Sequence, residues 1–207
     1  MMKLKLAALT LALAAALPAQ AALTHNEADI TNALVADFEN FDGLLSTGPE
    51  TVAPGITFTG DAGSELGAYI RDLGSNGVWG VGNHFAASGA IGELRFTFAD
   101  LTAGAGAFVN YFAANVFPFS VVVSVYGDNN QILESHTLAI ATDEYGYNEG
   151  RFLGITRDVA DIRSISFKGN GVVVDNLAVS QPVPEPETYA LLLAGLGLIG
   201  MAARRRG

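Results

Sequence analysis

The chain has 207 residues, the size of one domain, and half of its residues are hydrophobic, which is enough to bury a core. Its formal net charge of −10 argues against a nucleic-acid partner, because binding phosphates requires an excess of Lys and Arg. The sequence contains no cysteine, which excludes disulfide bonds, thiolate metal sites and a cysteine nucleophile. A mean hydropathy of +0.32 is high for so acidic a chain, so the apolar residues must be unevenly distributed.

The chain begins with an apolar run, residues 6–17, which follows two lysines and ends before a proline and small residues. This pattern is typical of a secretory signal peptide and predicts that residues 1–21 are removed. The A-x-A spacing of Ala19 and Ala21 predicts cleavage after Ala21. The run has no polar face, which argues against an amphipathic first helix. We therefore expect export through the inner membrane by the Sec machinery, followed by cleavage by signal peptidase.

Residues 22–181 are expected to form an all-β ectodomain. Nine segments are rich in Val, Ile, Phe, Tyr or Thr, and several alternate apolar and polar residues, as in 94–98. Such alternation indicates strands with one buried and one solvent-facing side. We expect an antiparallel two-sheet sandwich of the jelly-roll type, with a turn or short helix at 25–36. The predicted strands are 35–41, 55–59, 93–98, 107–113, 119–126, 132–140, 151–155, 164–168 and 172–180.

Two turns rich in glycine and asparagine separate neighbouring predicted strands. Residues 127–130 read Gly-Asp-Asn-Asn, and residues 169–171 read Gly-Asn-Gly. Asn-Gly favours the positive φ angles of two-residue hairpin turns. We therefore expect a hairpin at 169–171.

The ectodomain sequence shows no catalytic constellation. Ser135 and His136 are neighbours, so on a strand their side chains would point to opposite faces. The motifs of serine hydrolases, zinc peptidases and phosphate-binding loops do not occur. We expect no catalytic residue and a non-enzymatic protein. A glycan-active hydrolase is the least favoured alternative, because it needs two facing carboxylates and spacing alone selects no pair.

Acidic residues near the first and last predicted strands suggest a structural Ca²⁺ site. Glu39 and Asp42 lie at the end of the first strand, and Asp175 lies in the last. In sandwich folds these two strands often run side by side, and carboxylate oxygens suit Ca²⁺. The alternative is that these are ordinary solvated acids of turns. No other cofactor is expected.

Aromatic residues in loops are candidates for contact with an extracellular polysaccharide. Trp79 stands beside a glycine, and Tyr145 and Tyr147 belong to the loop Asp-Glu-Tyr-Gly-Tyr-Asn-Glu. An aromatic face stacks on a sugar ring while nearby acids and amides bind its hydroxyl groups. The alternative is that Trp79 fills the sandwich core and the two tyrosines pack within their loop.

The C-terminal region, residues 182–207, joins a proline-rich stretch to an apolar run at 189–203 and three arginines. As a helix, this run of roughly 15 residues would be ~23 Å long, somewhat short of the ~30 Å hydrocarbon core of a bilayer. It predicts a single transmembrane helix that spans with local thinning or snorkelling of the arginines. The arginines place the tail in the cytoplasm, so the precursor is anchored in the inner membrane.

The same region closely resembles the PEP-CTERM sorting signal of Gram-negative bacteria. The resemblance rests on Val183, Pro184, Glu185 and Pro186, followed in order by the short apolar run and the basic cluster Arg204, Arg205 and Arg206. It implies recognition by an exosortase, a membrane-embedded protease that cuts at or near the motif. The mature form would then be periplasmic, attached to the cell surface or extracellular.

Residues 107–180 resemble the ectodomain common among PEP-CTERM proteins, which is itself similar to galactose-binding-like and other carbohydrate-binding jelly rolls. The resemblance rests on 108–111, 148–155, 165–167 and 174–177. The ectodomain resemblance implies no agreed ligand. The sorting signal, typical of species that make extracellular polysaccharide, implies a protein of the cell surface or extracellular matrix, and we expect it to be non-enzymatic and linked to exopolysaccharide and biofilm. The alternative function is a carbohydrate-binding module, in one version Ca²⁺-dependent.

Overall fold

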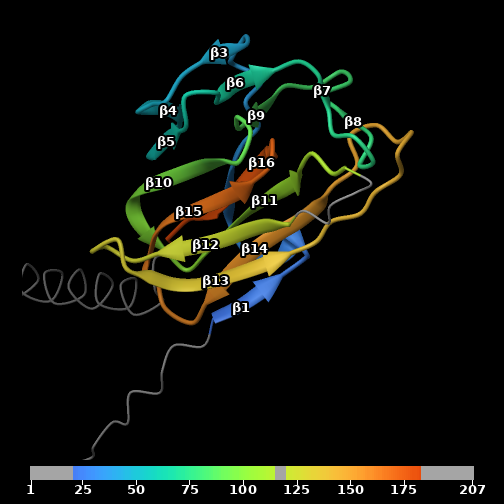
Figure 1. The fold of residues 1–207 in the computed structure, drawn as a ribbon. Helices are drawn as coiled ribbons and strands as arrows, with labels where there is room; N and C mark the ends of the chain where they lie inside the picture. Colours follow the sequence, from blue (N-terminus) through green and yellow to red (C-terminus); the bar gives the residue numbers. More distant parts are fainter. Residues whose placement is uncertain (1–20, 115–119, 183–207) are drawn as a thin grey trace, which may run out of the picture.

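Two antiparallel β-sheets pack face to face in the computed structural model, which describes residues 21–114 and 120–182 (Figure 1). No α-helix occurs among these residues, and the two sheets confirm the predicted all-β sandwich. The strands of the first sheet, called sheet A, are in spatial order β1 (Ala21–Thr24), β14 (Arg151–Arg157), β11 (Gly104–Asn110), β16 (Val173–Ser180), β9 (Phe85–Ala87), β6 (Glu65–Ala68) and β3 (Leu44–Leu45), and β2 (Ala33–Ala36) also pairs with β16. Those of sheet B are β13 (Ile132–Leu138), β12 (Val121–Tyr126), β15 (Ile162–Gly169), β10 (Gly92–Thr102), β5 (Ile56–Gly60) and β4 (Glu50–Ala53). A small hairpin consists of β7 (Arg71–Asp72) and β8 (Val78–Trp79).

Strand β10 shows how the alternating sequence builds the core. Leu94, Phe96 and Phe98 are buried between the two sheets, whereas Arg95 and Thr97 between them are partly exposed. Successive side chains of a strand point to opposite faces, so the apolar side chains of β10 all point toward sheet A. Burying each such Leu or Phe stabilises the fold by roughly 1.5–3 kcal/mol.

All nine predicted strands occur, with shifted boundaries. The strand predicted at 35–41 ends at Ala36 in β2, because the chain turns at Phe38, whose φ is 61°. The segment 25–36 forms only the 3-10 helix η1 (Glu27–Asp29) before β2 begins. The Asn26 side chain accepts a hydrogen bond from the Ala28 backbone N–H at 3.2 Å and caps this turn.

The hairpin predicted at 169–171 is wrong. β15, which precedes this turn, pairs with β10 and β12 in sheet B, whereas β16, which follows it, belongs to sheet A. Gly171 does adopt a positive φ of 54°, but the chain uses the turn to cross from one sheet to the other. The turn at 127–130 does join paired strands, β12 and β13.

Sheet A carries a second apolar layer on the face turned away from sheet B. Val109 and Val174 belong to the core between the sheets, so their neighbours Phe108 and Asp175 point to the opposite, outer face. There Phe108 packs against two apolar clusters, one that contains Trp79 and one that contains Phe152. This outer layer, and not the core of the sandwich, carries the candidate site described below.

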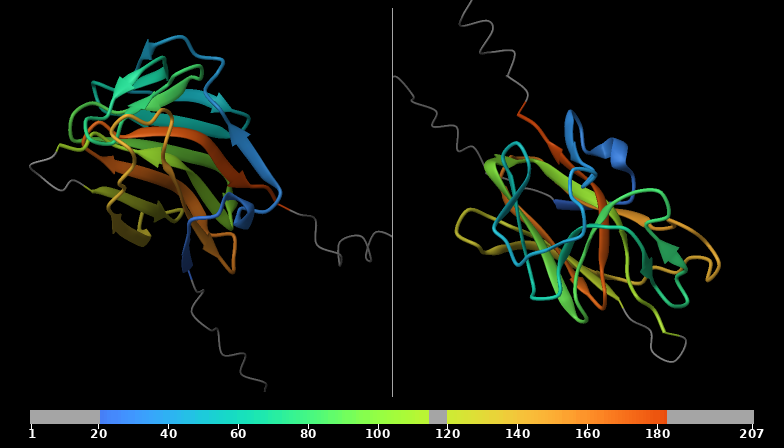
Figure 2. Two further views of the ribbon diagram at one scale, coloured as in Figure 1. Left: turned by 90° about the vertical axis from the view of Figure 1, so that its right-hand side faces the viewer. Right: turned by 90° about the horizontal axis from the view of Figure 1, so that it is seen from above.

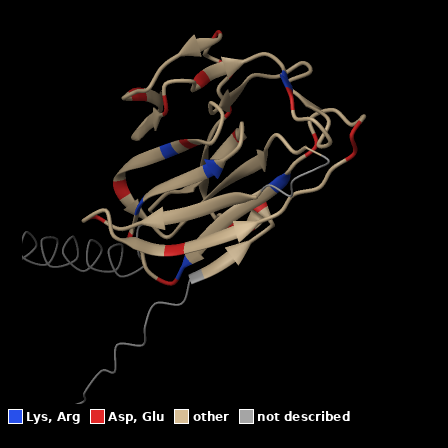
Figure 3. Ribbon diagram, viewed as in Figure 1, with Lys and Arg blue, Asp and Glu red and all other residues tan. Residues whose placement is uncertain are grey.

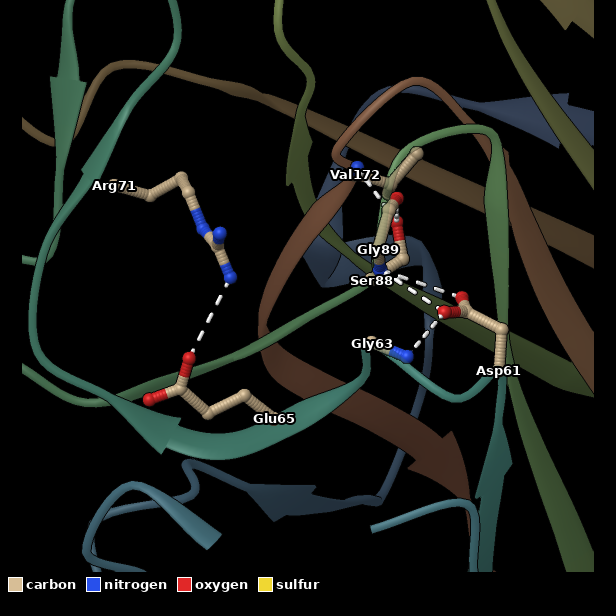
Figure 4. A network of polar contacts seen from close by, with 7 residues as sticks. All are labelled: Asp61, Gly63, Glu65, Arg71, Ser88, Gly89 and Val172. Carbon is tan, nitrogen blue, oxygen red and sulfur yellow. Dashed lines mark hydrogen bonds and ion pairs between the residues drawn. The ribbon is translucent and has the colours of Figure 1, made fainter. Parts of the chain in front are cut away.

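Polar contacts fix the strands and loops that support the outer layer (Figure 4). The Asp61 Oδ1 atom accepts a hydrogen bond from the Gly89 backbone N–H at 3.2 Å, which holds the loop after β9. Arg71 Nη2 lies 3.5 Å from Glu65 Oε2 and so ties β7 to β6. Arg71 is also the residue opposite Trp79 in the β7–β8 hairpin.

Strand β16, the last strand in the described part of the chain, lies inside sheet A and not at its edge. It pairs with β11 on one side and with β9 and β2 on the other (Figure 2). Ser180, the last residue of β16, lies opposite Ala33 of β2. The Gln181 backbone N–H then donates to the Asn32 carbonyl oxygen at 3.2 Å, so the chain is held almost up to Pro182.

Charged residues are spread thinly over this framework (Figure 3). Asp and Glu lie mainly in loops and at strand ends, and the few Lys and Arg residues are scattered. Most of the arginines have partners: Arg157 binds Asp161, and Arg163 binds Asp128. Positive charge is therefore dispersed over the part of the chain that the structure describes.

The predicted transmembrane helix at 189–203 lies outside the described residues. Within residues 21–114 and 120–182, no helix has the length and apolar character needed to cross a bilayer.

Candidate binding site

A cavity of about 260 Å³ opens on the outer face of sheet A. Two aromatic side chains, three amides and one carboxylate surround it. They are Trp79, Phe108, Asn83, Asn148, Asn176 and Asp175.

Asp175 is the buried carboxylate of this cavity, with 7% of its surface exposed. Its Oδ2 atom accepts a hydrogen bond from Asn83 Nδ2 at 2.7 Å, and its Oδ1 atom accepts one from the Asn176 backbone N–H at 2.7 Å. Burial raises the pKa of Asp175 to about 6, the two hydrogen bonds oppose the rise, and the charges of Glu39 and Asp37 add to it. At neutral pH the group is therefore mainly ionised, and it is held in one orientation.

An irregularity in β16 places two consecutive residues at the cavity. The pairing of β16 with β11 shifts register between the partners of Gly106 and Phe108, and Asn176 adopts a φ of 48°. A bulge of this kind redirects side chains that would otherwise alternate between the faces. The sequence signal for it is the pair Asp175-Asn176 in the middle of an otherwise apolar strand.

Trp79 forms a wall of the cavity and is 3% exposed. Its ring packs against Phe85 with 6.4 Å between the ring centroids. The far end of the indole lies over Gly150, where an added Cβ would be 2.5 Å from Cη2 of Trp79. Trp79 is therefore packed, but in the outer layer and not in the core of the sandwich, and it also borders the cavity. Its contact with a sugar stays a prediction.

Asn148 joins the tyrosine loop to the rim of the cavity. Its Oδ1 atom accepts hydrogen bonds from the backbone N–H groups of Gly80 at 2.7 Å and Val81 at 3.1 Å, and its Nδ2 atom donates to the Val81 carbonyl at 2.9 Å. The predicted contact residues Tyr145 and Tyr147 lie on the same loop and are 82% and 65% exposed. The loop is thus fixed beside the cavity, with both tyrosine rings in solvent.

The residues predicted to bind calcium are only partly brought together. The first and last predicted strands do lie side by side, since β2 pairs with β16, and Glu39 is close enough to Asp175 to raise its pKa. However, Glu39 Oε1 accepts from the His84 backbone N–H at 2.9 Å, and Asp42 is exposed. Within the described ranges, no group of three or more His, Asp or Glu side chains is arranged to hold a metal ion. The calcium site stays a prediction.

Two further predicted sites concern processing. Ala19, Val183, Pro184, Glu185 and Pro186, together with Arg204, Arg205 and Arg206, lie outside the described residues. Ala21 is the first residue of β1 and pairs with Arg157 of β14, so the predicted cut after Ala21 falls inside a strand of the folded domain.

Sequence reasoning missed four members of the cavity, namely Asn83, Phe108, Asn148 and Asn176. The residues that line the cavity come from four separate segments, at 79–83, 108, 148 and 175–176. Only folding brings these segments together. Asn148 and Asn176 share one available signal: asparagine tolerates the positive φ angles that both adopt.

Comparison with known families identifies the end of the chain. The family model of the PEP-CTERM protein-sorting motif matches residues 182–206. The chain carries a PEP-CTERM sorting motif. A PEP-CTERM motif marks an exported protein whose membrane-anchored precursor is processed by an exosortase and sorted to the cell surface. The resemblance noted from Val183 to Arg206 is thereby confirmed.

Comparison of the folded domain gives distant similarities. No curated protein sequence matches the chain. It is similar to the family 11 carbohydrate-binding module of a cellulosomal cellulase from Clostridium thermocellum, with 12% identity, a TM-score of 0.32, and coverage of 74% of this chain and 97% of the other. It is also similar to the CBM22-1 and GH10 modules of an endo-1,4-β-D-xylanase of Clostridium thermocellum complexed with xylohexaose, with 12% identity, a TM-score of 0.27, and coverage of 73% and 28%.

Proposed function

We propose that the PEP-CTERM protein acts at the cell surface or in the extracellular matrix, where its ectodomain binds a polysaccharide without cleaving it. The observation that carries this proposal is the cavity in which Trp79 and Phe108 border the buried carboxylate of Asp175 and three asparagine amides. Sugar rings present apolar C–H faces and a rim of hydroxyl groups. Aromatic surface beside oriented acids and amides is the combination that binds both.

Two residues that line the cavity each carry a polar atom that is buried and has no hydrogen-bond partner. Trp79 Nε1 and Asn83 Oδ1 are both buried, and neither has a hydrogen-bond partner among the described residues. A buried donor or acceptor without a partner costs about 1–3 kcal/mol. Asn83 is already oriented by its bond to Asp175, so a ligand hydroxyl group that reached its Oδ1 atom would recover part of this energy.

Two alternatives are less favoured by the same cavity. Asp175 is the one carboxylate among its described lining residues, whereas glycoside hydrolysis generally uses a pair. A purely structural matrix component would need no cavity on its outer face. Binding without turnover is therefore the function that this geometry supports best.

For processing, we propose the topology expected from the sequence. Residues 1–21 direct export and are removed, the run 189–203 holds the precursor in the inner membrane with Arg204–206 in the cytoplasm, and an exosortase cuts at or near Val183–Pro186. The family match at 182–206 supports the sorting part of this proposal.

Isothermal titration of the processed protein with the exopolysaccharide of the producing cells tests the binding function. We expect saturable binding that Asn83→Ala weakens roughly fivefold, the effect of about one hydrogen bond. Asn129→Ala, in the exposed turn after β12, is the matched control and should bind like wild type. Absence of binding to this polysaccharide and to a glycan array, with or without Ca²⁺, would refute the proposal.

Thermal unfolding of the processed protein with and without Ca²⁺ tests the calcium site. If Glu39, Asp42 and Asp175 hold a structural Ca²⁺ ion, millimolar Ca²⁺ should raise the melting temperature of the protein. An unchanged melting temperature would remove the ion from the proposal and leave the binding function as stated.

A further inference from the structure

A second cavity, of about 520 Å³, adjoins the first on the outer face of sheet A. Phe108 lines both cavities. The second one is also bordered by residues 25–27, which follow β1, by Gly150, which precedes β14, and by Arg151 and Phe152, the first two residues of β14.

The strand register places the two cavities in one row. Phe108 lies directly opposite Asp175 of β16 on one side and directly opposite Phe152 of β14 on the other. Neighbouring strands are ~4.8 Å apart, so the row from Asp175 to Phe152 measures roughly 10 Å between Cα atoms. The first cavity lies on the β16 side of Phe108, and the second lies on its β14 side. The Trp79 ring, which lines the first cavity, lies over Gly150, which precedes β14 and lines the second.

The second cavity repeats the chemistry of the first. The rings of Phe108 and Phe152 meet edge to face, with 5.5 Å between centroids, and provide apolar surface. His25 is exposed, and its Nδ1 atom lies 3.2 Å from the Phe152 carbonyl oxygen, which orients the imidazole at the cavity. Glu27 adds a carboxylate acceptor. Each cavity thus combines aromatic carbon with hydrogen-bonding groups.

We infer that the two cavities are subsites of one groove across β16, β11 and β14, and that the groove takes several consecutive sugars of a linear polysaccharide chain. This inference rests on the proposed glycan binding. Cavities that bind small molecules are typically 300–1,000 Å³ in volume, and the first cavity lies just below this range. Together with the second it offers room for an oligosaccharide, whose chain would run across the strands and pass over Phe108.

A size-fractionated ladder of oligosaccharides, made by partial hydrolysis of the exopolysaccharide, tests the inference by titration of the processed protein. Affinity should rise with chain length by roughly fivefold or more, the effect of added hydrogen bonds in the second cavity, and then level off. His25→Ala should weaken binding of the long oligosaccharides roughly fivefold and leave the shortest bound fragment unchanged. Asn83→Ala should weaken both, and Asn129→Ala should weaken neither.

An NMR measurement on the unsubstituted protein gives a second readout that does not depend on a variant folding. The backbone amide signals of Asn26 and Gly150 should shift with long oligosaccharides and not with the shortest bound fragment. If a single sugar binds as tightly as the longest fragment, or if His25→Ala changes binding at no length, the groove is refuted while the proposed function stands. If neither polysaccharide nor ladder binds at all, the proposed function fails and the groove fails with it.

Discussion

Phe108 lies directly opposite Asp175 across the β11–β16 pair, so an aromatic ring and an ionisable carboxylate share one row on the outer face of sheet A. The apolar layer around Phe108 explains why burial is the main cause of the raised pKa of Asp175 and the nearby acids a lesser one. The same pairing puts a carboxylate at the edge of an aromatic surface, which is the arrangement that the proposed binding function uses.

The raised pKa of Asp175 predicts a pH dependence of stability. Its carboxyl binds a proton more tightly in the folded state, with a pKa of about 6, than in the unfolded state, near 3.8. As the pH rises from about 3.8 through about 6, the unfolding free energy of wild type should therefore fall by up to about 3 kcal/mol relative to Asp175→Asn. Urea denaturation of both proteins across this range measures the difference.

Asp100→Asn provides the control for this titration, because Asp100 is exposed on β10. Its unfolding free energy should follow that of wild type over the same pH range. A constant difference between wild type and Asp175→Asn from low to neutral pH would show that the carboxyl of Asp175 is not perturbed.

Removing the side-chain amide of Asn148 should free the strand end at the rim of the cavity. Asn148→Gly keeps a residue suited to the φ of 57° but deletes three hydrogen bonds to Gly80 and Val81. We expect a loss of about 2 kcal/mol in stability and faster hydrogen exchange at the amides of Gly80 and Val81. Unchanged protection of these two amides would contradict the role assigned to Asn148.

The contact between Gly150 and Trp79 can be tested through fluorescence, since Trp79 is the single tryptophan of the chain. Gly150→Ala would place a Cβ atom 2.5 Å from Cη2 of the indole. The same Cβ atom would lie 2.9 Å from the Val109 carbonyl oxygen. The ring or the backbone beside it must shift, which should change the emission spectrum and destabilise the fold by about 1–3 kcal/mol. In Gly104→Ala the new Cβ meets Ser180 Oγ at 3.1 Å, so the emission spectrum should stay as in wild type.

The sorting motif predicts the mass of the mature protein. In cells that contain the exosortase, mass spectrometry should find a C-terminus that lacks Arg204–206. Replacing Glu185 and Pro186 with alanine should leave these arginines in place, whereas Glu187→Ala, outside the core motif, should be processed normally. An intact arginine tail on the wild-type protein in such cells would refute the processing site.

The sequence was sufficient to predict strands in which apolar and polar residues alternate. Leu94, Phe96 and Phe98 alternate with polar residues, and β10 forms where expected. β6 and β9, in contrast, read Glu-Leu-Gly-Ala and Phe-Ala-Ala, which have little intrinsic strand preference. They are strands because they pair with one another and β9 pairs with β16, which is information that no local window contains.

The candidate site was predictable from the sequence only in part. Trp79 and Asp175 were singled out for their residue types, but for different ligands, because nothing in the sequence indicates that they border one cavity. The amides of Asn83 and Asn176 are placed by a long-range hydrogen bond and by a bulge. Both depend on tertiary register, which the spacing of residues along the chain does not determine.

The position of β16 has a consequence for how export and assembly are ordered in time. Its neighbours β2, β9 and β11 are all made earlier, so until residues 173–180 have crossed the membrane the two halves of sheet A have an open slot between them. The sorting motif follows within a few residues of that final strand. A chain that ends before residue 173 would therefore lack both its central strand and its sorting motif, so every chain that carries the motif also contains the strand that completes sheet A.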